Sequence, residues 1–116
     1  MERKLSYEGL DVYQRTIEFI AWAMVVVEEL PKRTLGDQMQ RAAMSIALNI
    51  AEGAGKTRGP DRAHFYDIAR GSAMECGAIL DVALAMKITR SETRAAGKDH
   101  LVAIVAMLTR LSQSAR

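Results

Sequence analysis

The chain has 116 residues, of which 49% are hydrophobic and 5% aromatic, and a formal net charge of +2 from 16 basic and 14 acidic side chains. This length predicts a single domain over residues 1–116 with one hydrophobic core. The small net charge excludes a strongly basic nucleic-acid coat protein, and the single cysteine excludes an intrachain disulfide or a thiolate metal cluster.

Helix-favouring residues dominate the middle of the chain, chiefly Ala, Leu, Met, Glu, Arg and Lys. The sequence lacks a sustained alternation of apolar and polar residues, and it lacks the Asn-Gly and Asp-Gly pairs that form hairpin turns. The composition therefore predicts an all-α fold. Because Cys76 is the one thiol and no apolar run has the length of a signal peptide or a bilayer span, we expect a cytoplasmic protein with no membrane contact.

The first helix is expected over residues 9–30, after a loose segment of residues 1–8. Its second half is apolar nearly all round, because Trp22 and Val25 add a third apolar line to two core-facing stripes. A helix in a small monomeric bundle keeps one polar face. The excess of apolar surface predicts a second packing surface, most simply with another subunit, and an unusually thick core is the alternative.

The second helix is expected over residues 35–53, after Pro31 has ended the first helix and with Thr34 as its N-cap. Its polar residues recur at steps of three and four and form one thin seam on an otherwise apolar helix. A solvent-facing helix would have a wider polar face. We therefore interpret it as a central helix whose seam is buried or half-buried and needs polar partners.

The third helix is expected over residues 60–87, because Pro60 is favoured in a first helical turn. The fourth helix is expected over residues 91–113, with Ser91 as its N-cap. Four helices joined by short connections predict an up-down-up-down four-helix bundle.

The third helix supplies partners for the polar seam if it packs antiparallel to the second. A midpoint near residue 58 pairs Arg41 with Glu75 as a charge-assisted ion pair. The expected facing pairs are Arg41–Glu75, Ser45–Gly71, Asn49–Asp67 and Glu52–His64. This register predicts a structural polar ladder between the two helices.

A catalytic seam is the alternative, because Glu52, His64 and Asp67 are potential acid and base groups. No nucleophile or metal trio accompanies them, and ion-pair networks also gather titratable groups. We therefore expect no enzyme activity and no catalytic residues. A metal or other cofactor is not expected either, since His64 and His100 lack the Glu-x-x-His pattern of di-iron bundles.

The segment GAGKT at residues 53–57 superficially resembles a phosphate-binding loop. That motif needs a glycine where Ile50 stands and a strand before it, which excludes nucleotide hydrolysis. Lys56, Arg58 and Arg62 nevertheless lie beside the amino end of the third helix, where anions bind. A solvated basic loop is the alternative.

Both ends of the expected bundle are basic. Alternating helix directions gather Lys32, Arg33, Lys87 and Arg90 at one end, and Lys56, Arg58 and Arg62 at the other. A cyclic oligomer would repeat each end into a ring, which would turn a small protomer charge into a multivalent phosphate-binding surface.

Three segments carry a family resemblance: YEGLDVYQRTIEF at residues 7–19, RAAMSIALNIAEG at 41–53 and FYDIARGSAME at 65–75. Over residues 7–86 the chain resembles the S23, or 23S rRNA intervening-sequence, family, to which the accessory variability proteins of diversity-generating retroelements are related. The resemblance implies a non-enzymatic four-helix bundle that assembles as a cyclic homopentamer. It also implies nucleic-acid binding, although the retroelement relatives are strongly basic and this chain is not.

Two functions follow from these observations. The first is a non-enzymatic oligomeric scaffold that binds RNA or DNA phosphates through its basic rims. The second is a protein–protein adaptor without nucleic-acid binding, whose docking surface includes Trp22 and Val25. Salt separates the two, because phosphate contacts weaken steeply with ionic strength and apolar docking does not.

Overall fold

The computed structural model describes residues 3–116. Over this range the chain forms a short 3-10 helix, Ser6–Gly9, and four α-helices: α1 (Asp11–Glu29), α2 (Arg33–Ala54), α3 (Gly59–Ala85) and α4 (Ser91–Ala115). This part of the chain contains no strand, which confirms the all-α class. Every end of the four α-helices lies within two residues of its predicted position.

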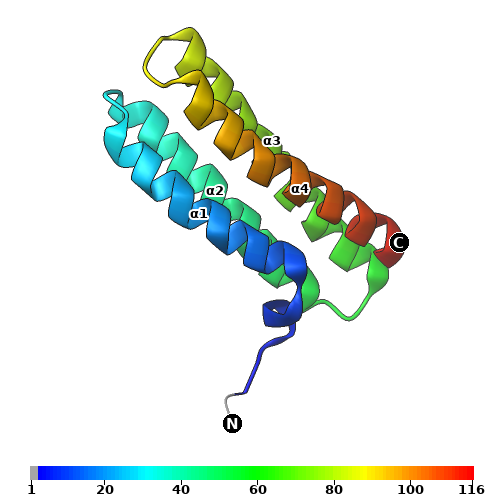
Figure 1. Ribbon diagram of the computed structural model, residues 1–116. Coiled ribbons are helices and arrows are strands. Elements are labelled where there is room, and N and C mark those ends of the chain that lie inside the picture. The colour runs from blue at the N-terminus through cyan, green and yellow to red at the C-terminus, as the bar shows by residue number, and fades with distance from the viewer. Residues whose placement is uncertain (1–2) are drawn as a thin grey trace.

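Consecutive helices run in opposite directions (Figure 1). The α1–α2 and α3–α4 connections lie at one end of the bundle, and the α2–α3 loop lies at the other (Figure 1). This arrangement sets the N-termini of α2 and α4 at the same end. Among the described residues, no helix combines the length and apolar character needed to cross a bilayer.

The segment before α1 is more ordered than predicted. Residues 6–8, which we expected to be loose, lie in the 3-10 helix, while residues 1 and 2 lie outside the described residues. The ring of Tyr7 lies 4.7 Å from that of Tyr13, and Ser6 Oγ donates to the carbonyl oxygen of Ala54 at 3.3 Å. These contacts fasten the segment to α1 and α2.

The core combines a few large side chains with many alanines. Its largest fully buried members include Phe19, Met39, Ile46, Ile50, Leu80, Ile104 and Leu108. Ala43 and Ala69 are fully buried on α2 and α3. Small side chains allow two helix backbones to approach closely, which explains why an alanine-rich sequence makes a compact bundle.

Trp22 belongs to the packing between α1 and α4. Its ring stacks on Phe19 with centroids 5.8 Å apart and lies against Gly97, where an added Cβ would come within 2.6 Å of the indole Cη2. The predicted docking line of Trp22 and Val25 is therefore divided. Trp22 is half-buried inside the bundle, and Val25 is 60% exposed on α1.

The N-cap predictions for Thr34 and Ser91 are wrong. The N-caps of α2 and α4 are Lys32 and Arg90, and neither makes a side-chain capping hydrogen bond. Thr34 and Ser91 already lie inside the first turn of their helices, so their hydroxyls are past the position from which a cap forms.

Candidate functional site

The centre of the predicted polar seam is a hydrogen-bonded cluster between α2 and α3. Ser45 Oγ and Ser72 Oγ lie 2.8 Å apart. Asn49 Nδ2 donates to the Ser45 carbonyl oxygen at 2.8 Å and to Ser45 Oγ at 3.1 Å. All three side chains are half-buried, and within residues 3–116 no buried side-chain nitrogen or oxygen lacks a partner. The Ser45–Ser72 bond joins α2 to α3, whereas both bonds of Asn49 stay within α2.

The predicted ion pair of Arg41 and Glu75 is wrong. Both side chains are exposed, and residues 3–116 contain no salt bridge between them. The partner of Ser45 is Ser72, one residue beyond the expected Gly71. A shift of one residue turns a helical position by about 100°, which directs the seam's outer charges toward solvent.

The other seam residues bind different partners from those predicted. Asp67 accepts hydrogen bonds from Ser112 Oγ at 2.5 Å and Arg116 Nη2 at 3.2 Å, so it faces α4 and not Asn49. Glu52 lies 3.5 Å from Lys56 Nζ, and His64 is exposed. The structure therefore does not bring Glu52, His64 and Asp67 together as an acid–base group. No set of three or more metal-ligating side chains gathers within the described residues.

The basic residues of the α2–α3 loop are largely engaged within the protein. Lys56 pairs with Glu52 and lies 5.2 Å above the Phe65 ring. Arg62 Nη1 donates to the carbonyl oxygens of Thr57 at 2.9 Å and Lys56 at 3.3 Å. These contacts hold the loop against the start of α3. Arg58 is exposed and is the one predicted cation of this loop without such a contact in the described residues.

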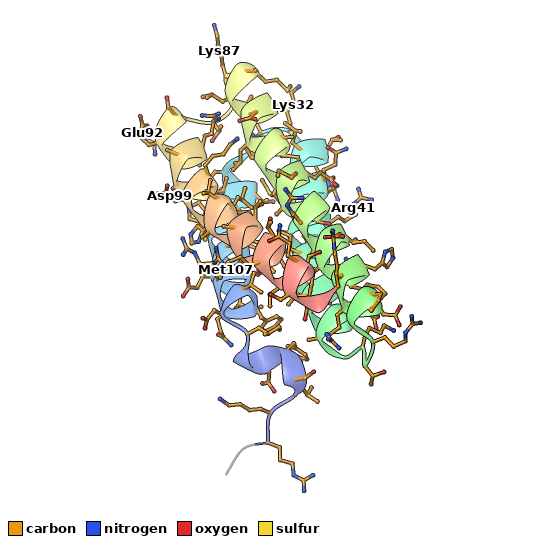
Figure 2. The ribbon with its side chains drawn as sticks, turned by 90° about the vertical axis from the view of Figure 1, so that its right-hand side faces the viewer. Lys32, Arg41, Lys87, Glu92, Asp99 and Met107 are labelled. Atoms are coloured by element: carbon orange, nitrogen blue, oxygen red, sulfur yellow. The ribbon has the colours of Figure 1, made fainter. Side chains whose placement is uncertain are left out.

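The opposite end presents four free cations, which we call the basic end: Lys32, Arg33, Lys87 and Arg90. All four are exposed, and none takes part in a salt bridge within residues 3–116. Figure 2 shows Lys32 and Lys87 together at this end of the molecule. Lys32 lies in the α1–α2 connection and Arg33 is the first residue of α2, while Lys87 and Arg90 lie in the α3–α4 connection at the same end (Figure 1).

Two helix N-termini add to the positive potential of the basic end. The first backbone N–H groups of α2 and α4 follow Lys32 and Arg90, and neither N-terminus has a side-chain cap. A cation next to the positive end of a helix is unfavourable, whereas an anion there is stabilised. Cations and uncapped N–H groups at one place form the arrangement to which phosphate oxygens bind.

Acidic side chains border this surface on several helices. Glu29 and Glu92 line a shallow hollow with Arg90, between the end of α1 and the start of α4. Glu92 projects from the flank of the molecule away from Lys32 (Figure 2). On α2, Asp37 is exposed one helical turn after Arg33, so acidic side chains border the basic end on α1, α2 and α4.

Lys87 has a left-handed backbone, with φ of 61°. Its N–H donates to the carbonyl oxygen of Leu84 at 2.9 Å, and the N–H of Ile88 donates to that of Ala83 at 3.0 Å. These two bonds form a Schellman motif that ends α3, at a position where glycine is usual. A lysine in this conformation is strained, and strained residues gather at functional sites. No signal in the sequence distinguishes this lysine from any other helix-terminal one.

Comparisons with known proteins agree with this fold. The family model described as 23S rRNA-intervening sequence protein matches residues 8–110. A solved structure of a protein with unknown function from the S23 ribosomal protein family of Bacteroides thetaiotaomicron is similar, with a TM-score of 0.77 and 20% sequence identity. The similarity covers 84% of this chain and 94% of that one, and at this identity it shows the fold alone. No curated protein matches the sequence.

Proposed function

The chain belongs to the family of 23S rRNA-intervening sequence proteins, and we propose that it is a non-enzymatic, self-associating scaffold that binds RNA or DNA phosphates. One observation carries this proposal: four exposed cations without ion-pair partners in the described residues lie at the same end of the bundle as two uncapped helix N-termini. The family description, which refers to ribosomal RNA, is consistent with a phosphate-bearing ligand.

The titratable side chains support a non-enzymatic role. Burial raises the pKa of Cys76 to about 12, so the thiol stays protonated at neutral pH and is a poor nucleophile. Burial also raises the pKa of Tyr66. Hydrogen bonds from Arg94 and Lys98 lower the pKa of Asp81, which keeps this carboxylate ionised in a surface ion cluster. Each of these shifts accompanies packing or pairing and not a gathered catalytic group.

Self-association is part of the proposal because one copy offers few phosphate contacts. The net charge is +2, and affinity for nucleic acid rises with the number of phosphates neutralised at once. A ring of copies, such as the pentamer that the family resemblance implies, would repeat the basic end on one face and add the contacts of each copy. The relationship to retroelement accessory variability proteins stays a prediction. The nucleic-acid binding test described next also bears on it.

The proposal is tested by fluorescence anisotropy with structured RNA and with duplex DNA across a salt series. We expect submicromolar binding at low salt that weakens with a log–log slope of several units, since each neutralised phosphate contributes about 0.9. Changing Lys32, Arg33, Lys87 or Arg90 singly to Gln should reduce the slope by about one for each phosphate that the variant no longer neutralises.

Arg41→Gln is the matched control, because Arg41 is equally exposed but lies on the flank of α2 (Figure 2). It removes the same charge and should leave the slope nearly unchanged. Absence of binding at about 50 mM salt, where charge attraction is exaggerated, would refute the nucleic-acid role. Equal reductions in affinity for Arg41→Gln and Lys87→Gln would refute the assignment to the basic end.

The second candidate function is a protein–protein adaptor. It is favoured by large apolar side chains that stand exposed on every helix, among them Val25 at 60%, Leu48 at 63% and Val102 at 68%. Such exposure exceeds what a small monomer needs and marks interaction surfaces. If nucleic acid does not bind, this role is the one to pursue.

A further inference from the structure

An apolar groove runs between α3 and α4 on the outer surface of the bundle. It has a volume of about 440 Å³, and its walls include Met74 and Ala78 on α3 and Val102 and Ala106 on α4. Met74 is 53% exposed and Val102 is 68% exposed. Ala73 and Gly77 also line the groove, and their small size leaves it open.

The two ends of the groove are positively charged. At one end Asp81 Oδ1 lies 2.7 Å from Arg94 Nε and 3.1 Å from Lys98 Nζ. Because two cations share one carboxylate, one positive charge is left over. Toward the other end lies Arg70, which is exposed and precedes Met74 by one helical turn. The groove therefore suits an apolar segment with acidic flanks.

The outer face of α1 has this pattern. Ile17, Ala21 and Val25 follow one another at intervals of four residues and are exposed, with Ile17 at 41% and Val25 at 60%. Glu18 and Glu28 flank this line at its two ends, and neither forms a salt bridge within residues 3–116. The face lies opposite the side of α1 that packs into the core.

The two surfaces also agree in length. Ile17 and Val25 are eight residues apart, as are Lys98 and Ala106, which corresponds to about 12 Å along a helix. Along α1, Glu18 and Glu28 are about 15 Å apart. The two ends of the groove are marked on α3 by Arg70 and by Asp81, the partner of Arg94 and Lys98. These two residues are about 16 Å apart along the helix. Both acids of α1 can thus meet a positive end of the groove.

We infer that the outer face of α1 from one copy of this chain docks into the α3/α4 groove of another copy. This inference rests on the self-association in the proposed function and names its contact surfaces. The contact joins two different faces, so it is head-to-tail, and a pair of copies keeps one free α1 face and one free groove. Such contacts build closed rings when the rotation between copies permits.

An exposed apolar pair on α2 is a weaker match for the groove. Met44 and Leu48 lie one turn apart on α2, and both are exposed. The charges beside them are Asp37 and Arg41, which are of opposite sign. This patch offers two apolar side chains and no acidic surplus, so it does not complement a groove with positive ends.

The test uses two variants that each damage one face. Val25→Lys places a cation on the α1 face, and Val102→Glu places an anion in the groove, where it opposes Glu18 or Glu28. Size-exclusion chromatography with light scattering should show a wild-type oligomer, and each variant alone should move to the protomer mass of 12.8 kDa. Mixing the two variants should restore species of at least twice that mass, because each retains the face that is damaged in the other.

Leu48→Lys is the matched control, since Leu48 is 63% exposed on α2 and the change in charge and size is comparable. It should keep the wild-type mass, and circular dichroism should show the same helicity for all three variants. A monomeric wild-type chain at its highest soluble concentration would overturn the inference. So would a mixture of Val25→Lys and Val102→Glu that stays monomeric, or dissociation caused by Leu48→Lys alone. Because the measurement contains no nucleic acid, its failure is distinct from a failure of phosphate binding.

Discussion

Arg15 Nε donates a hydrogen bond to Nδ1 of His100 over 3.1 Å, and this contact ties α1 to α4. The imidazole also lies against the rings of Phe19 and Trp22, with centroids 5.9 and 6.1 Å away. Since a guanidinium only donates, the hydrogen bond exists only while Nδ1 carries no proton. Burial and, secondly, the charge of Arg15 lower the pKa of His100, against opposing effects of the Glu18 and Asp99 carboxylates.

We predict that mild acid weakens the fold through this contact. The pKa of His100 is lower in the folded chain than in the unfolded one, so the unfolded chain binds more protons between those two values. The free energy of unfolding should therefore fall as the pH drops below about 6.5, the ordinary pKa of histidine. Urea denaturation at a series of pH values measures this dependence.

His100→Gln should flatten the pH dependence between about pH 6.5 and 5, above the range in which most carboxylates titrate. His64→Gln is the control, because His64 is exposed and its ring contacts Phe65 only at an edge. If the His100 variant retains the full pH dependence of the wild-type chain, the contact with Arg15 is not its source.

A second prediction compares two helical glycines. An added Cβ at Gly97 would lie 2.5 Å from Leu80 Cδ1 and 2.6 Å from Trp22 Cη2, whereas at Gly71 nothing lies within 4 Å. Gly97→Ala should destabilise the fold by about 1–3 kcal/mol, because the Trp22 ring is held by Phe19 and cannot move freely. Gly71→Ala should stabilise it by about 0.5–1 kcal/mol through helix propensity.

Thermal and urea unfolding of the two variants check this pair directly. Both changes add one methyl group to a helix interior, so helix propensity alone predicts the same sign for both. Stabilisation by Gly97→Ala would show that the indole ring yields to the added methyl group and that the α1–α4 contact is loosely packed.

The helices were predictable because their signals are local. Apolar residues at steps of three and four mark each core face, and Pro31 and Pro60 mark helix ends within a few residues of themselves. Because helix directions alternate, the order of the helices alone predicts that Lys32 and Lys87 lie at one end, as Figure 2 shows. The same spacing marked Ser45 and Asn49 as polar residues that need partners, but it did not predict Ser72 as the partner of Ser45.

The failures concern relations between distant residues. A midpoint misplaced by half a residue in the α2–α3 register was enough to exchange Gly71 for Ser72 and to predict an ion pair that does not form. The bond between Arg15 and His100 joins positions 85 residues apart, and no periodicity predicts it. Lys56 and Arg62 were predicted to bind anions, but the chain uses them first to hold its own loop.

The corrected seam leads to a third prediction. Ser72→Ala removes the half-buried partner of Ser45 and should destabilise the fold by about 1 kcal/mol. Arg41→Ala should change stability by less than about 0.5 kcal/mol, because Arg41 is exposed and has no ion-pair partner in the described residues. Urea denaturation of both variants measures the difference, and a destabilisation of several kcal/mol by Arg41→Ala would restore the ion pair that the structure argues against.

The last prediction separates stability from binding at Lys87. Its φ of 61° suits glycine, so Lys87→Gly should stabilise the fold by about 1 kcal/mol, while it removes a cation from the basic end. Lys87→Gln removes the same charge and keeps a side chain in the strained conformation, so it should weaken binding without the gain in stability. Urea denaturation and RNA anisotropy on both variants measure these two effects separately.

If both variants bind less tightly and only the glycine variant is more stable, the strain is kept in order to place a cation at the end of α3. If both variants bind as well as the wild-type chain, Lys87 makes no phosphate contact, and its conformation serves only to end the helix.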